Sequence, residues 1–155
     1  MKGLFLDRDG VINEDFGYVY KIEDFKFKEG IFKVLKKAMD KEYKIFIITN
    51  QSGISRGYYT ENDFLKLMNW VQEQFLKKEI KITDIAFCPH HPDDNCDCRK
   101  PKPKMILDLI KKYNIDPSKS IMVGDKDSDV EAGKNANIAT NIKINDSILE
   151  IIDLL

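Results

Sequence analysis

The sequence predicts a three-layer α/β fold, in which a mainly parallel sheet has helices on both faces. Two observations support this prediction. Short apolar runs alternate with segments of helical apolar spacing along the chain, and the length of 155 residues fits one domain, residues 1–155. Right-handed crossovers bring the carboxyl ends of parallel strands to one edge, where ligands bind in folds of this class.

Five apolar runs of strand length are expected to form the sheet. The first ends abruptly at Asp7, the second ends at Thr49, and the fourth is closed by Gly124 and Asp125. The expected strands are residues 2–6, 44–48, 82–88, 120–123 and 138–142.

Helical spacing predicts five helices between and after these strands. The second helix opens with Thr60 and Asp63, which resemble a capping box with Asp in place of Glu or Gln. Its expected apolar face consists of Phe64, Leu67, Met68, Val71, Phe75 and Leu76. The expected helices are residues 29–41, 60–77, 102–113, 127–135 and 146–154.

Composition and charge exclude several classes of protein. The 25 basic and 26 acidic residues give a net charge of −1, whereas strong binders of a phosphate backbone show a basic excess or a basic face. No apolar stretch is long enough to span a membrane, and the apolar run at the N-terminus is too short for a signal peptide. We therefore expect a cytoplasmic monomer that binds neither nucleic acid nor membrane.

The three cysteines lie within eleven residues of one another. An odd number of cysteines at this spacing favours a metal site over a disulfide framework. Three thiolates and one imidazole form the closed tetrahedral set of a structural zinc, so the expected zinc ligands are Cys88, His90, Cys96 and Cys98. His91 is the alternative to His90.

Polar residues gather at the ends of three expected strands. Asp7 and Asp9 flank one arginine before the turn residue Gly10, and residues 49–53 offer a hydroxyl, two amides and a glycine turn that suit phosphate oxygens. Asp125 and Asp129 lie four residues apart and share one helix face if that helix starts early. Each pattern alone also fits a turn, a helix cap or an acidic helix terminus, so the argument rests on their combination.

Together these segments resemble the haloacid dehalogenase superfamily of phosphatases, whose pattern is D-x-D-G, a Thr or Ser after the second strand, a Lys before a later helix, and acidic residues after a fourth strand. The resemblance spans residues 7–129 and implies a Rossmann-like fold; the chain leaves no room for a large cap domain. It also implies a phospho-aspartate at Asp7. Asp9 would act as general acid and base, and Thr49 and Lys100 would hold the phosphoryl oxygens.

The same resemblance implies a catalytic Mg²⁺. Its ligands would be Asp7, the backbone carbonyl of Asp9, and Asp125, because Mg²⁺ prefers hard oxygen ligands and keeps several waters. Asp129 would orient a metal-bound water.

The zinc-loop segment, residues 88–98 followed by R-K-P, resembles the branch that holds the D-glycero-D-manno-heptose bisphosphate phosphatases and the histidinol-phosphate phosphatases. Residues 15–19 and 49–57 resemble substrate-contacting segments of the heptose enzymes, whereas the five residues between His90 and Cys96 resemble the histidinol-phosphate branch. A sugar bisphosphate that loses the phosphate on carbon 7 is therefore the expected substrate, with histidinol phosphate as the alternative. The implied substrate-binding residues are Asp15, Gly17, Tyr18, Asn50, Gln51, Ser52, Arg56, Arg99 and Lys126.

Three rival functions fit part of the sequence. A phospho-receiver module also carries an acceptor aspartate on an α/β domain, but it would have no zinc loop. A zinc-dependent nucleic-acid binder is disfavoured by the neutral net charge. A nucleic-acid 3′-phosphatase would show a basic, aromatic groove for the strand, which the sequence does not predict.

Overall fold

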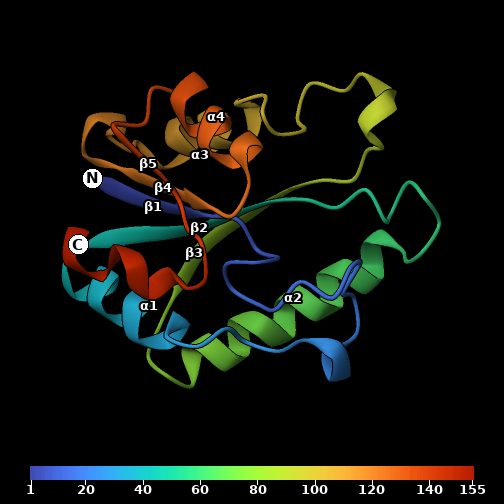
Figure 1. Ribbon diagram of the computed structural model, residues 1–155, viewed down its shortest axis with the longest axis horizontal. Helices are drawn as coiled ribbons and strands as arrows, with labels where there is room; N and C mark the ends of the chain where they lie inside the picture. Colours follow the sequence, from blue (N-terminus) through green and yellow to red (C-terminus); the bar gives the residue numbers. More distant parts are fainter.

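The computed structural model describes all 155 residues, and its centre is a five-stranded parallel sheet in the order β3-β2-β1-β4-β5 (Figure 1). This confirms the predicted fold class. The strands are β1 (Lys2–Leu6), β2 (Tyr43–Asn50), β3 (Ile82–Cys88), β4 (Ile121–Gly124) and β5 (Thr140–Lys143).

Helices cover both faces of the sheet. One face is covered by α3 and α4, and the other by α1, α2 and a C-terminal 3₁₀ helix (Figure 1). The helices are α1 (Ile31–Asp40), α2 (Glu61–Leu76), α3 (Lys104–Tyr113) and α4 (Asp127–Asn135). Short 3₁₀ segments are Ile22–Asp24, Pro92–Asp94, Pro117–Lys119 and Ile148–Leu154. No helix has the length and apolarity that crossing a bilayer requires.

Alternation along β1 divides the core into two parts. Leu4 and Leu6 join the cluster beneath α1 and α2, while Phe5 joins the cluster beneath α3 and α4, where it stacks on Phe46. All three side chains are fully buried. Because both faces are covered, β1 reads as a continuous apolar run instead of alternating with polar residues.

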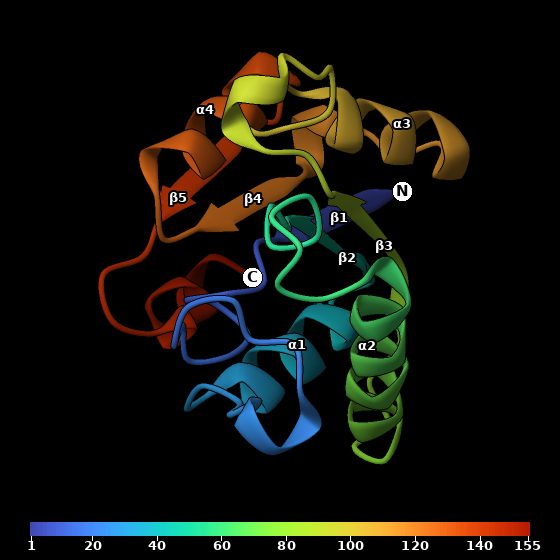
Figure 2. The same cartoon turned by 90° about the vertical axis from the view of Figure 1, so that its right-hand side faces the viewer.

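The strand order places a topological switch at β1. The chain moves outward from β1 to β2 and β3, then crosses back to β4 on the other side of β1. Ligands in open α/β sheets bind in the crevice at such a switch point, outside the carboxyl ends of the strands. Figure 2 looks onto this side of the molecule, where the loops that follow β1, β2 and β3 gather.

Several predicted boundaries were wrong. The segment predicted as a last helix is a 3₁₀ helix, in which Ile148 and Ile151, three residues apart, both pack into the core. Leu76 is 59% exposed although Phe75 in the same turn is buried, because the 3.6-residue period of the helix puts position 76 off the apolar face of Phe64, Val71 and Phe75. The third helix begins at Lys104 and not at residue 102. Residue 102 precedes Pro103, and a proline disfavours helical backbone in the residue before it.

Candidate active site

The turn after β1 carries the first two aspartates. The backbone carbonyl of Arg8 accepts hydrogen bonds from the N–H groups of Val11 and Ile12, which folds the chain back tightly. Gly10 has φ +91°, and a Cβ atom there would lie 2.0 Å from Asp125 Oδ2. Glycine at this position therefore allows the β1 turn to pack directly against the segment after β4.

Three carboxylates from these two segments form one cluster. Each of Asp7, Asp125 and Asp129 offers an oxygen, and these oxygens lie within 4.8 Å of one another. Asp125 Oδ1 is buried and has no hydrogen-bond partner, which a cation would supply. An all-oxygen set of this kind fits Mg²⁺, since Mg²⁺ binds few carboxylates and completes its shell with water.

Asp125 and Asp129 meet in a different way from that predicted. The α4 helix begins at Asp127, so Asp125 lies in the preceding turn and does not share a helix face with Asp129. Asp129 instead reaches back from the first turn, where its Oδ2 accepts a hydrogen bond from the backbone N–H of Lys126 at 3.2 Å.

Lys100 inserts its ammonium group between two of the carboxylates. Its Nζ lies 2.8 Å from Asp7 Oδ1 and 2.7 Å from Asp129 Oδ1, and it donates to the Ile48 carbonyl at 2.9 Å. The Asn50 side chain holds the Lys100 backbone, accepting from its N–H at 3.1 Å and donating to its carbonyl at 3.4 Å. The last residue of β2 therefore positions a residue that lies in the loop after β3.

Electrostatics in the cluster favour a bound cation. Burial raises the pKa of Asp7 to about 7, against the opposing effect of Lys100 and with a further increase from the Asp129 charge. Burial disfavours the charge on Lys100, but Asp7 and Asp129 outweigh it and raise the Lys100 pKa. One lysine does not neutralise three buried or half-buried carboxylates, so a divalent cation would relieve their repulsion.

Asp9 stands outside this cluster and has its own set of donors. Its Oδ1 accepts from Arg8 Nη2 at 2.8 Å and from Asn13 Nδ2 at 3.0 Å, and its Oδ2 accepts from Gln51 Nε2 at 3.3 Å. Arg8 is fully buried and also donates to the Val19 carbonyl at 2.7 Å. One guanidinium thus ties Asp9 to the segment that carries residues 15–19.

A cavity of about 390 Å³ opens beside these groups and is lined by fifteen residues, two of them hydrophobic. All nine residues predicted to bind substrate line it, together with Asp7, Asp9, Lys100 and Asp129. Arg99 Nη1 is buried there without a hydrogen-bond partner, and an anionic ligand would supply one. Most ligand pockets are largely apolar, so this lining suits a small, highly polar and anionic ligand.

The structure departs from the predicted site at a few residues. Thr49 is 1% exposed and is not among the lining residues; its hydroxyl accepts from Gln51 Nε2 at 2.9 Å. Its predicted contact with phosphoryl oxygens stays a prediction. Tyr59 and Ser128 line the cavity but were not predicted. Arg8 and Asn13 were missed as partners of Asp9, because side-chain contacts formed within one tight turn leave no spacing signal.

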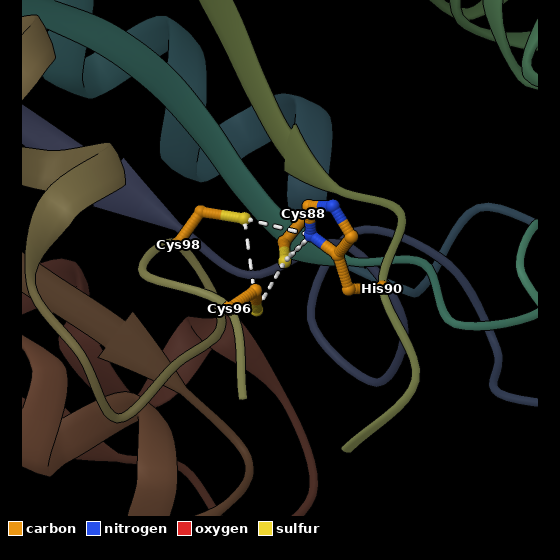
Figure 3. A group of neighbouring side chains, drawn as sticks. All are labelled: Cys88, His90, Cys96 and Cys98. Atoms are coloured by element: carbon orange, nitrogen blue, oxygen red, sulfur yellow. Dashed lines mark hydrogen bonds between the residues drawn. The ribbon is translucent and has the colours of Figure 1, made fainter. Parts of the chain in front are cut away.

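The predicted zinc ligands form a second cluster, at the end of β3 and in the loop beyond it (Figure 3). The distance from Cys88 Sγ to Cys96 Sγ is 3.6 Å and from Cys96 Sγ to Cys98 Sγ is 3.9 Å, while His90 Nδ1 lies 3.4 Å from Cys88 Sγ and 3.3 Å from Cys98 Sγ. With Zn–S near 2.3 Å and Zn–N of about 2.0–2.1 Å, a tetrahedral ion requires S···S of about 3.8 Å and S···N of about 3.5 Å. The four groups therefore fit a tetrahedral zinc.

His91 does not belong to this cluster. Its Nδ1 accepts from the backbone N–H of Asp93 at 3.1 Å. Of the two histidines that the sequence left as alternatives, His90 is the one that lies with the three cysteines.

Comparisons with known proteins agree with this geometry. Residues 1–137 match the haloacid dehalogenase-like hydrolase family. The chain is 51% identical over 145 residues to a D-glycero-alpha-D-manno-heptose-1,7-bisphosphate 7-phosphatase of Campylobacter jejuni, covering 94% of this chain and 83% of the relative. It is 49% identical over 150 residues to a D-glycero-beta-D-manno-heptose-1,7-bisphosphate 7-phosphatase of Helicobacter pylori, covering 96% and 86%.

A solved structure is similar along most of its length. It is the D,D-heptose 1,7-bisphosphate phosphatase from B. bronchiseptica complexed with magnesium and phosphate, with a TM-score of 0.85, 30% identity, and coverage of 90% of this chain and 79% of that chain. These similarities confirm the family predicted from the sequence and favour an enzyme over a phospho-receiver module. The chain belongs to the haloacid dehalogenase-like hydrolase family.

Proposed function

We propose that this protein is a magnesium-dependent phosphatase that hydrolyses a sugar phosphate through a phospho-aspartate at Asp7. The observation that carries the proposal is the contact of Asp7 with both Lys100 and the Asp125–Asp129 carboxylates, beside a polar cavity. Asp7, Asp125 and the Asp9 carbonyl would hold Mg²⁺, which would supply the charge that screens the carboxylate nucleophile from its anionic substrate.

The first half-reaction transfers the phosphoryl group to the protein. An Asp7 carboxylate oxygen attacks phosphorus, and the bond from phosphorus to the ester oxygen breaks. The leaving alkoxide takes a proton from Asp9 and departs as an alcohol. Lys100 stabilises charge on the phosphoryl oxygens, and its backbone is held in place by Asn50.

The second half-reaction frees the nucleophile. Asp9 now takes a proton from a water molecule, which attacks the phosphorus of the aspartyl phosphate. The bond between phosphorus and the Asp7 oxygen breaks, inorganic phosphate leaves, and Asp7 is again a carboxylate. Asp9 gives and receives the same number of protons, so the cycle balances.

The proposed substrate is D-glycero-D-manno-heptose 1,7-bisphosphate, from which the phosphate on carbon 7 is removed. The phosphatases named above act on this bisphosphate by their names, and one is named for the alpha and the other for the beta anomer. The cavity has the side chains to hold a second phosphate, since Arg56, Arg99 and Lys126 line it in addition to Lys100.

A phosphate-release screen tests this proposal. We expect both anomers of heptose 1,7-bisphosphate to be hydrolysed with a higher kcat/KM than fructose 1,6-bisphosphate or histidinol phosphate. The five-residue spacing between His90 and Cys96 makes histidinol phosphate the informative competitor. A clear preference for histidinol phosphate would overturn the substrate assignment, and no release from any ester would overturn the enzymatic one.

We also propose that zinc at Cys88, His90, Cys96 and Cys98 fixes the loop that leads into two positively charged residues of the cavity. Cys98 is followed directly by Arg99 and Lys100, and the loop is bonded to the segment after β2 through Gln51 N–H to the Cys88 carbonyl at 2.7 Å. Closed four-ligand sites stabilise the folded state and take no part in chemistry.

Zinc removal should therefore abolish most activity even when Mg²⁺ is restored. We expect kcat/KM to fall about 100-fold or more, the loss that follows removal of one preorganised charge donor. His90→Ala should lose zinc, measured as metal content, whereas the matched variant His91→Ala should keep it. Full turnover by zinc-free, magnesium-loaded protein would contradict this role.

A further inference from the structure

Tyr59 is a buried cavity residue to which the proposed mechanism gives no task. It is 5% exposed and follows the loop after β2, two residues before α2 begins. A Cβ atom at Gly53 would lie 2.2 Å from its ring, so that glycine makes room for it. Its hydroxyl donates to Gln51 Oε1. Burial raises the pKa of Tyr59 to about 12, which keeps this phenol protonated at neutral pH.

Gln51 joins Tyr59 to Asp9. Its Nε2 donates to Asp9 Oδ2 at 3.3 Å and to Thr49 Oγ1 at 2.9 Å, while its Oε1 accepts the Tyr59 proton. Rotating the amide by 180° would turn its oxygen toward Asp9 Oδ2 and set two acceptors against each other. The hydrogen bond from Tyr59 therefore selects the orientation in which Gln51 donates to Asp9.

The two oxygens of Asp9 differ in the partners they have. Arg8 and Asn13 both donate to Oδ1, at 2.8 Å and 3.0 Å, so Oδ1 is occupied by protein. Oδ2 has only the longer contact with Gln51. The proton that Asp9 gives to a leaving group is then carried by Oδ2, and Gln51 is the residue that orients this oxygen.

We propose that Tyr59 is a positioning residue that, through the Gln51 amide, aims Asp9 Oδ2 at the leaving-group oxygen. This inference rests on the proposed function, since it assigns Tyr59 a part in the proton transfer from Asp9. Tyr59 acts through two other side chains and needs no contact with the reacting atoms.

The dependence on the leaving group separates this role from a structural one. A sugar alkoxide leaves only when it is protonated, whereas p-nitrophenolate leaves readily without a proton, so only the first needs a well-aimed acid. The ratio kcat/KM reports the steps up to release of the alcohol or phenol, and the later hydrolysis of the aspartyl phosphate does not enter it.

Tyr59→Phe is the decisive variant because it removes one hydroxyl and keeps the ring. With heptose 1,7-bisphosphate we expect kcat/KM to fall about 10- to 100-fold, a part of the 10²–10⁴ that general acid catalysis supplies. With p-nitrophenyl phosphate we expect a change below about twofold. Tyr20→Phe is the matched control, since the Tyr20 ring stacks on Tyr59 at 5.1 Å but contributes nothing to the Asp9 hydrogen bonds.

Two results would overturn the inference: equal losses on both esters, or no loss on either. A second experiment follows the relay itself. In a Gln51→Met background, Tyr59→Phe should cause no further loss, because the connection is already cut; a further loss as large as that in the wild-type background would also refute it. If the wild-type protein hydrolysed neither ester, the proposed function would fail, whereas an active wild type with equal losses refutes only the role of Tyr59.

Discussion

Asp7→Asn is expected to abolish turnover while leaving the fold and the zinc site in place. An amide oxygen is a poor nucleophile, so kcat should fall on the order of 10⁵-fold or more, as when a nucleophile is removed from other enzymes. Asn is nearly isosteric and its oxygen can still accept from Lys100 Nζ, which in the wild type lies 2.8 Å from Asp7 Oδ1. Activity is measured as phosphate release, and zinc as metal content.

A thermal-melt experiment supplies the control for this variant. Mg²⁺ should raise the Tm of the wild type more than that of Asp7→Asn, because the variant loses one of three clustered carboxylates. Residual activity within about tenfold of the wild type would refute Asp7 as the nucleophile.

Lys100→Met should damage both stability and catalysis. Its removal leaves Asp7 and Asp129, both largely buried, without their ion pair, and breaking such a pair costs about 3–5 kcal/mol of the free energy of unfolding. Loss of one charge donor should lower kcat about 10²–10³-fold. Lys104→Met is the matched control, since Lys104 pairs with Asp108 on the surface, where solvent screens the pair and its loss should change stability little.

The stability deficit of Lys100→Met should grow with pH in magnesium-free protein. Burial already raises the pKa of Asp7 to about 7 with Lys100 present, and removal of the lysine raises it further. A carboxyl group whose pKa is higher in the folded than in the unfolded state favours folding at low pH, and this contribution is lost as pH rises through the folded pKa. The deficit should therefore be small near pH 4 and large near pH 8; a pH-independent deficit would contradict the ion-pair explanation.

Much of the architecture was predictable because local signals agreed with the packing. Thr60 and Asp63 do form the predicted capping box, and all the apolar positions predicted for α2 except Leu76 are buried. The first and third strands have the predicted bounds, since each is a run of residues buried or half-buried on both faces and bounded by polar turns.

The remaining features of the site depend on side-chain directions that the sequence does not specify. Which of the two adjacent histidines faces the cysteines depends on the direction of the backbone turn, and two identical neighbours in a sequence do not reveal that direction. Tyr59 was missed because a tyrosine next to a helix start reads as a surface or core aromatic, and its partner Gln51 is eight positions away. Thr49 was placed at a strand end, but β2 continues through it to Asn50 and leaves its hydroxyl buried.

The central place of β1 has a consequence for how the protein is made. Leu4 of β1 pairs with Ile121 of the neighbouring strand β4, and the N–H of Gly3 donates to Ser120 Oγ, 117 positions away in sequence. Such distant pairings form late, because the entropy cost of closing a long loop comes before the stabilising contacts form. A ribosome therefore releases the nucleophile long before the segment that holds Asp125, and a nascent chain interrupted before β4 would carry the attacking group but remain inert.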